Sequence, residues 1–270
     1  MFERILVAVD GSPFSEDVIP YALGIAEATA GKLTLLRVAE KGFEAEAEAY
    51  THELAARFTA ESRVIPSRGN VWVDILDEAN SVPGTLVALT SHGRGGVLTA
   101  VLGSVAREIV QASHNPVLVY RPEDESSKAH KPISIASVLL PLDGTHLSES
   151  MKPQAAGLAR ALGVRLTIVQ VLPAKTRTDP LLASYDVLDS SYVSSHAHEI
   201  HREFGVEVDW EVLYGEPVES ITRYLDGRRD VLAVMATREQ NAMKAAVLGS
   251  VTSGMVHRSG IPIVVQAPGK

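Results

Sequence analysis

Short apolar runs alternate with amphipathic segments along the whole chain. Residues 4–9 and 117–120 are almost continuously apolar, which is typical of strands that are covered on both faces of a sheet. Residues 14–30 repeat apolar positions every three or four residues, which predicts a helix. The other elements predicted in this part are strands at 33–38, 63–66 and 86–89 and helices at 44–61, 70–80 and 103–113. This alternation predicts an α/β fold, a doubly wound parallel sheet with helices on both faces.

The same pattern occurs twice. Residues 5–38 align without a gap on residues 138–171, and 13 of the 34 positions are identical. Residues 86–120 align on residues 232–266, and 11 of the 35 positions are identical. Two matched blocks in the same order indicate two tandem copies of one α/β domain.

The repeat sets the expected domain boundaries. We predict a first domain at residues 1–121, a linker at 122–134 and a second domain at 135–270. The linker is rich in proline and charged residues, as linkers between domains usually are. The offset between the copies is 133 in the first block and 146 in the second. The second copy therefore carries an insertion, which we expect within residues 173–195.

Composition and charge exclude several functions. The chain has 270 residues, a net charge of −8 and no cysteine, so thiol nucleophiles and Cys-based metal sites are excluded. The lack of cysteine suits a reducing cytoplasm, where we expect the protein to act. A negative net charge argues against nucleic acid as a partner. With no apolar run long enough to span a bilayer and no signal-peptide pattern at the start, we expect no membrane partner.

A glycine-rich loop is the first candidate site. It follows the predicted strand at 86–89 and contains Gly93 and Gly103, which permit close approach of a ligand to the backbone. Ser104 places a hydroxyl beside the start of the next helix, where anions are favoured. The loop alone leaves phosphate binding and a plain turn as equal alternatives.

An acid at the end of each first strand is the second candidate. Asp10 and Asp143 each precede a glycine, at the edge of the sheet where doubly wound folds bind ligands. A carboxylate there can accept hydrogen bonds from ribose hydroxyls. The alternative is an aspartate that caps a helix or a turn, which is common at this position.

Other motifs point to no catalytic or metal site. The chain has no P-loop, no G-x-G-x-x-G after the first strand and no G-x-S-x-G elbow. His196, His198 and His201 cluster in sequence, but a solvated helix face explains them better than a metal site. We assign no enzyme activity.

Several segments together resemble the universal stress protein family. They are VAVDGS at 7–12, SHGRGG at 91–96, LGSVA at 102–106 and NPVLVYRP at 115–122. The family pattern is G-x-x-G, nine residues and then G-[ST]; Gly93 and Gly103-Ser104 match it, whereas Thr90 replaces the first glycine. The resemblance covers nearly the whole chain as two tandem domains. It implies Rossmann-like domains of the adenine nucleotide alpha hydrolase-like type.

The resemblance also implies a ligand and a site. The ligand would be an adenine nucleotide, ATP with or without Mg²⁺, bound in the N-terminal domain. By position, the residues implied at the adenine and ribose are Ala8, Val9, Asp10 and Val38, and those implied at the phosphates are Leu89, Thr90, Gly93, Gly103, Ser104 and Val105. Thr90 is expected to weaken ATP binding without abolishing it, and slow ATP hydrolysis is left open.

The second copy departs further from the family pattern. Ala236 and Glu239 stand where the two glycines of G-x-x-G belong, while Gly249 and Ser250 are kept. A carboxylate facing the phosphates would be repelled by them. We therefore expect the second nucleotide loop to be degenerate.

The expected function is that of a regulatory or protective stress-response factor that responds to ATP. The alternative is an interaction module that binds no nucleotide and works through oligomer surfaces. Each copy ends in an apolar strand, at 117–120 and 263–266, and exposed apolar edges are usually covered. We therefore predict that these two strands pair as an internal pseudo-dimer, and that two chains can pair further as a homodimer.

Overall fold

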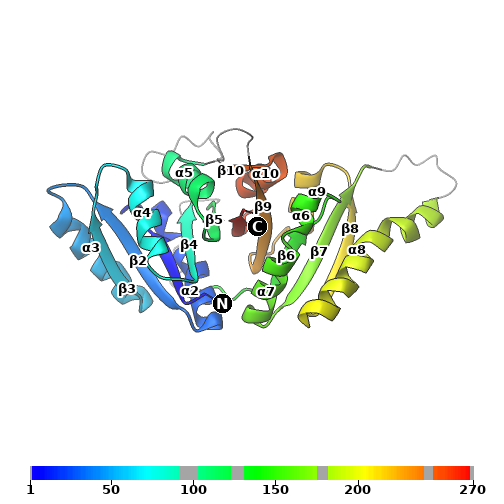
Figure 1. Ribbon diagram of the computed structural model, residues 1–270, viewed down its shortest axis with the longest axis horizontal. Coiled ribbons are helices and arrows are strands. Elements are labelled where there is room, and N and C mark those ends of the chain that lie inside the picture. Colours follow the sequence, from blue (N-terminus) through cyan, green and yellow to red (C-terminus); the bar gives the residue numbers. More distant parts are fainter. Residues whose placement is uncertain (1, 92–101, 123–130, 175–181, 240–245, 268–270) are drawn as a thin grey trace.

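A single sheet of strands runs through the whole computed structural model (Figure 1). The structure describes residues 2–91, 102–122, 131–174, 182–239 and 246–267. The strands are β1 (Arg4–Ala8), β2 (Lys32–Ala39), β3 (Glu61–Pro66), β4 (Thr85–Thr90), β5 (Val117–Tyr120), β6 (Ser137–Pro141), β7 (Arg165–Leu172), β8 (Val208–Tyr214), β9 (Val231–Glu239), β10 (Ala246–Leu248) and β11 (Ile263–Gln266). The helices are α1 (Pro13–Glu16), α2 (Ile19–Thr29), α3 (Glu44–Phe58), α4 (Val71–Asn80), α5 (Ser104–Ala112), α6 (His146–Glu149), α7 (Lys152–Leu162), α8 (Leu182–Phe204), α9 (Pro217–Tyr224) and α10 (Ser250–Arg258).

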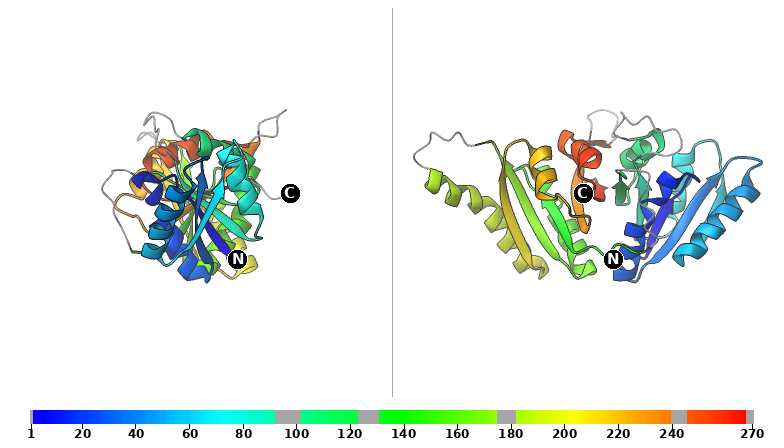
Figure 2. Two further views of the ribbon diagram at one scale, coloured as in Figure 1. Left: turned by 90° about the vertical axis from the view of Figure 1, so that its left-hand side faces the viewer. Right: turned by 180° about the vertical axis from the view of Figure 1, so that it is seen from behind.

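The strand order is symmetric about its centre. It runs β3-β2-β1-β4-β5-β11-β9-β6-β7-β8, and β10 pairs with β9 off this path. All neighbours on the path are parallel except β5 and β11, which pair antiparallel, with Val117 opposite Val265 and Val119 opposite Ile263. The predicted pairing of the two final strands is thus confirmed, as is the α/β fold class. A two-fold relation between the halves is visible in Figure 1 and, from behind, in Figure 2.

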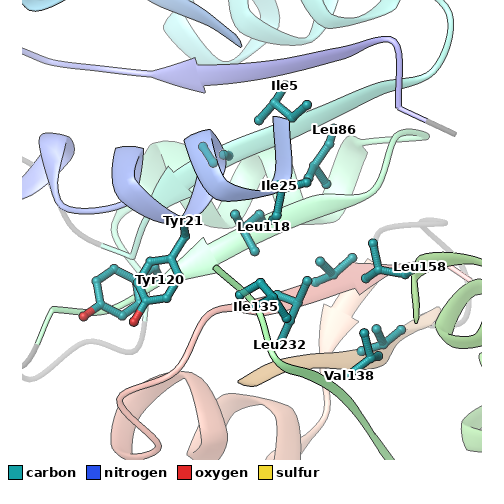
Figure 3. Close-up of a cluster of buried hydrophobic side chains, with 14 of the residues drawn as sticks. Ile5, Tyr21, Ile25, Leu86, Leu118, Tyr120, Ile135, Val138, Leu158 and Leu232 are labelled. Atoms are coloured by element: carbon teal, nitrogen blue, oxygen red, sulfur yellow. The ribbon is translucent and has the colours of Figure 1, made fainter. Parts of the chain in front are cut away.

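Helices cover both faces of the sheet, and each covering layer runs across both halves. Helices α2, α3, α7 and α8 pack on one face and α4, α5, α9 and α10 on the other. At the centre, the rings of Tyr21 and Tyr120 lie 4.8 Å apart, close to Ile135 and Leu232 of the second half (Figure 3). Because both apolar clusters contain residues of both halves, burying them favours the paired arrangement.

The helix predicted over residues 14–30 is wrong in one respect, because it is broken into α1 and α2. Pro20 has no N–H to donate, and its ring conflicts with the carbonyl four residues earlier, so a continuous helix cannot pass through it. The chain instead turns at Asp17 and Val18 and begins a new helix with Pro20 in the first turn, where proline is tolerated. Pro153 has the same effect between α6 and α7.

The second half differs from the first most clearly in α8 and β9. Helix α8 has 23 residues where α3 has 15, so part of the expected insertion lengthens this helix. Strand β9 has 9 residues where β4 has 6, and it pairs antiparallel with β10, a strand that the sequence pattern did not predict. Strand β10 contacts α5 of the first half.

The end of the expected linker is attached to the first half. Residues 123–130 lie outside the described part of the chain, but Ile133 donates its N–H to the carbonyl of Pro20 at 2.9 Å. A β-carbon on Gly24 would lie 2.1 Å from the carbonyl oxygen of Ile133. Glycine is therefore required on this face of α2 for the backbone to approach so closely. Across the described ranges, no helix has the length and apolar character needed to cross a membrane.

Candidate functional site

A cavity of about 840 Å³ opens at the carboxyl ends of β1, β2 and β4 in the first half. Its other walls come from the loop after β2 and from α3, α4 and α5. Parallel strands end together at this edge, where the strand order reverses, so the cavity occupies the usual ligand position of a doubly wound sheet. Its volume lies within the ordinary range for small-molecule sites.

The strand-end residues expected at the base and ribose all line this cavity. They are Ala8, Val9, Asp10 and Val38. The carboxylate of Asp10 accepts hydrogen bonds from the backbone N–H of Ser12 at 2.9 Å and from its hydroxyl at 2.5 Å. Asp10 therefore holds the turn before α1 and also borders the cavity, so its two proposed roles are compatible. Arg37 reaches the same wall and donates to the carbonyl of Val9 at 3.4 Å.

The residues expected at the phosphates meet on the opposite side. Leu89, Thr90, Gly103, Ser104 and Val105 line the cavity, whereas Gly93 lies outside the described residues. The N–H of Gly103 donates to the carbonyl of Ser91 at 2.7 Å, which joins the start of α5 to the end of β4.

Helix α5 presents its N-terminus to the cavity. Gly103 is the residue before the helix, and in the described part of the chain no side chain caps this end. The backbone N–H groups of the first turn have no partner within a helix. Together with the helix dipole, they form a site that favours an anion.

The wall contributed by α3 was missed by sequence analysis. Phe43, Glu46, Ala47 and Tyr50 all line the cavity. The hydroxyl of Tyr50 donates to Oε1 of Glu16 at 3.1 Å. Burial, together with the nearby charge of Glu16, raises the pKa of Tyr50 above its usual range, so this phenol stays protonated and neutral. These residues carry no motif, and only the packing of α3 against β2 brings them to the site.

The corresponding cavity of the second half is much smaller, about 110 Å³. It is bordered by Asp143, Thr145, Ser148 and Gly249, among others. Burial alone would raise the pKa of Asp143, but hydrogen bonds from Ser148 and Thr145, both at 2.6 Å, lower it below its usual value. Asp143 is thus a charged residue that organises its own turn.

The loop expected to be degenerate has a different structure in its described part. Thr237 and Glu239 continue strand β9 and pair with Leu248 and Ala246 of β10. In the first half, β4 ends at Thr90, before Ser91, the counterpart of Thr237, and the counterpart of Glu239 lies outside the described residues. The longer strand in the second half accompanies the smaller cavity.

The histidines singled out in the sequence have structural partners. His196 lies 3.0 Å from Glu199 and 3.2 Å from the amine of Lys152, and the ring nitrogens of His198 and His201 lie 2.7 and 2.9 Å from backbone carbonyls. Among the described residues, no three His, Asp or Glu side chains are placed to share a metal ion.

Comparison with known proteins assigns the class of the chain. The model of the universal stress protein family matches residues 1–121 and again residues 135–266. The chain therefore belongs to the universal stress protein family and carries the family domain twice.

Individual relatives agree with this assignment. A protein of Staphylococcus epidermidis named as a universal stress protein is 29% identical over 147 residues, which covers 49% of this chain and 84% of that protein. The crystal structure of a universal stress protein from Archaeoglobus fulgidus superposes with a TM-score of 0.62 at 18% identity and covers 99% of both chains. One from Pseudomonas aeruginosa superposes with a TM-score of 0.66 at 16% identity and covers 99% of this chain and 94% of that one. At such identities the structural likeness shows the fold alone.

Proposed function

We propose that the N-terminal half binds one adenine nucleotide, with ATP as the expected ligand, and that the chain acts as a nucleotide-responsive regulatory or protective stress factor. One observation carries the proposal. All of the residues that the family resemblance implied at the ligand line the cavity of about 840 Å³, apart from Gly93. The family membership of both halves supports the stress-response role.

The donor set suits a nucleotide. Ala8, Val9 and Val38 offer an apolar wall for a base, and Asp10 offers a carboxylate for ribose hydroxyls. The uncapped first turn of α5 offers N–H groups for phosphate. The proposed ligand is ATP with or without Mg²⁺, and the site contains no group that we assign to catalysis.

The second half contributes little to this binding in our proposal. Its cavity of about 110 Å³ is smaller than the usual range for small-molecule sites. The expected stoichiometry is therefore one nucleotide per chain. The cytoplasmic location and the pairing of two chains as a homodimer stay predictions from the sequence.

The test is to measure the nucleotide content of the purified chain by denaturation and chromatography, followed by calorimetric titration of the emptied protein with ATP. The expected result is one site per chain. Two equal sites would overturn the asymmetry. Absence of any adenine nucleotide binding would favour the alternative, an interaction module that works through oligomer surfaces, and light scattering would then test for its assemblies.

A further inference from the structure

An unusually exposed aromatic ring stands at the rim of the first-half cavity. In the described part of the chain, the exposed large apolar side chains are Phe43, Val105, Trp210 and Tyr214. Phe43 is the most exposed of them, at 58%, and it lines the cavity. Apolar side chains scattered singly on a surface are normal, whereas an apolar ring that lines a cavity is placed to contact what the cavity holds.

The backbone holds this ring in a defined place. The N–H of Phe43 donates to the carbonyl of Glu40 at 3.0 Å, and the carbonyl of Phe43 accepts from Ala47 at 3.0 Å. Between them, Gly42 has a φ of 89° and donates its N–H to the carboxylate of Glu44 at 2.8 Å. Phe43 thus sits at a hydrogen-bonded junction between a tight turn and α3, a position that fixes the start of its side chain.

Phenylalanine is not favoured at this position by the preferences of residues at helix starts. Phe43 is the residue immediately before α3, where Ser, Thr, Asp or Asn would cap the free N–H groups, and it makes no capping hydrogen bond. Its side chain is also not buried, so packing does not explain it. Local rules broken in this way are expected at functional positions.

Charge distinguishes the two ends of the cavity. Glu40 and Glu46 border it beside Phe43 and outnumber Arg37, which donates to the carbonyl of Val9. The N-terminus of α5 and Arg107 border it at the other end. Phosphates are repelled by the first end and attracted to the second. A bound nucleotide therefore directs its uncharged base toward Phe43.

We propose that Phe43 stacks on the base of the bound nucleotide and closes the open side of the base subsite, so that the site discriminates a nucleotide from a base-free sugar phosphate. The inference rests on the proposed function, because it assigns a residue to that same site. The counterpart segment of the second half, residues 173–181, contains no aromatic residue. This difference separates the two halves at the base as well as at the phosphates.

The experiment is calorimetric titration of the full chain and of Phe43→Ala with AMP and with ribose 5-phosphate. Loss of stacking should weaken AMP binding about tenfold and leave ribose 5-phosphate unaffected. Phe43→Tyr, which keeps a ring, should bind AMP like the unaltered chain. Trp210→Ala is the matched control, since it removes a 39%-exposed aromatic on β8, away from the cavity; thermal melting should show every variant folded.

A second measurement needs AMP alone. Phe43→Trp, in a chain with Trp72→Phe and Trp210→Phe, should lose fluorescence when AMP binds. AMP binding that is unchanged in Phe43→Ala, or that leaves the new tryptophan unquenched, overturns the inference while the proposed function stands. An unaltered chain that binds no AMP and no ATP overturns both.

Discussion

The two halves of the molecule share a framework but differ at its rim. Both halves have the same strand order, and in both a proline ends the short helix that follows the first strand. In both, an aspartate, Asp10 or Asp143, accepts a backbone hydrogen bond in the turn before that helix. Their cavities nevertheless measure about 840 and 110 Å³. Both halves share the apolar pattern that builds the framework, so their cavities differ through the elements that they do not share, such as the longer β9. The contribution of each half can be tested by substituting a residue in one half and, as a control, the residue at the matching position of the other half.

The largest expected effect is loss of nucleotide binding in Gly103→Asp. Gly103 has a φ of −64°, which any residue can adopt, so the variant should fold. Aspartate is a good residue before a helix, and its carboxylate would accept the N–H groups that we assign to phosphate. We expect ATP affinity to fall about 100-fold or more, since charge-assisted hydrogen bonds are lost and a like charge is added.

Gly249→Asp is the matched control. Gly249 precedes α10 with a φ of −63° and also lacks a side-chain cap. Its substitution should leave ATP affinity unchanged, and both variants should melt at or slightly above the temperature of the unaltered chain. Equal losses of affinity in the two variants, measured by calorimetry, would show that both halves bind nucleotide.

The next effect concerns the junction of the halves. Gly24→Ala would place a methyl group 2.1 Å from the carbonyl oxygen of Ile133, and overpacking of this kind lowers stability by about 2 kcal/mol. Gly157 occupies the corresponding position in α7 and has no atom within 4 Å of the added carbon. Gly157→Ala should therefore stabilise the chain, by up to about 1 kcal/mol. Urea unfolding measures both, and a Gly24→Ala chain as stable as Gly157→Ala would show that residues near Ile133 do not pack as described.

The smallest effect is a difference in acid sensitivity. Asp74 is buried and accepts hydrogen bonds from the backbone N–H of Arg68 at 3.0 Å and from its Nε at 2.7 Å. Burial alone would raise the pKa of Asp74, but these contacts outweigh it and lower the pKa. The second half has a neutral residue there, Ser220, which donates to the carbonyl of Tyr214 at 3.1 Å.

The lowered pKa of Asp74 determines in which direction stability changes with pH. Its contribution to stability is complete above the pKa of an unfolded aspartate and is lost as pH falls from about 4 through the folded value. Asp74→Asn should therefore narrow the difference in urea midpoint between pH 7 and pH 3. Ser220→Ala should leave that difference as it is in the unaltered chain. Identical pH dependence in all three chains would contradict the assignment.

Much of the fold could be predicted from the sequence. Buried parallel strands are apolar on both faces, so the apolar runs at residues 4–9 and 117–120 predict strands. The repeat in the sequence then predicts that the second half has the same fold as the first. Pairing of β5 with β11 could also be predicted, because both strands are apolar and would otherwise leave an open edge. The break between α1 and α2 is also encoded locally, because Pro20 cannot stand inside a continuous helix.

Only part of the candidate site could be predicted from the sequence. Strand-end residues such as Asp10 and Val38 are fixed by topology, because parallel strands end at one edge of the sheet. Tyr50 lies in α3 and Phe43 immediately before it. The apolar pattern of a helix predicts which face packs on the sheet, but not which cavity lies beside the start of the helix. Strand β10 pairs with β9 and contacts α5, a helix more than a hundred positions earlier in the chain, and no local pattern encodes such a contact.

The antiparallel junction of β5 and β11 has a consequence for how the molecule can vary. In a dimer of identical subunits, each substitution appears on both sides of the axis, so a change that spoils one pocket spoils its twin. Here the two partners share one chain, and each position exists once. Glu239 alters the second half while Gly93 is kept in the first, and the junction survives both. The chain is in effect a heterodimer of fixed one-to-one composition, whose partners cannot be separated by dilution.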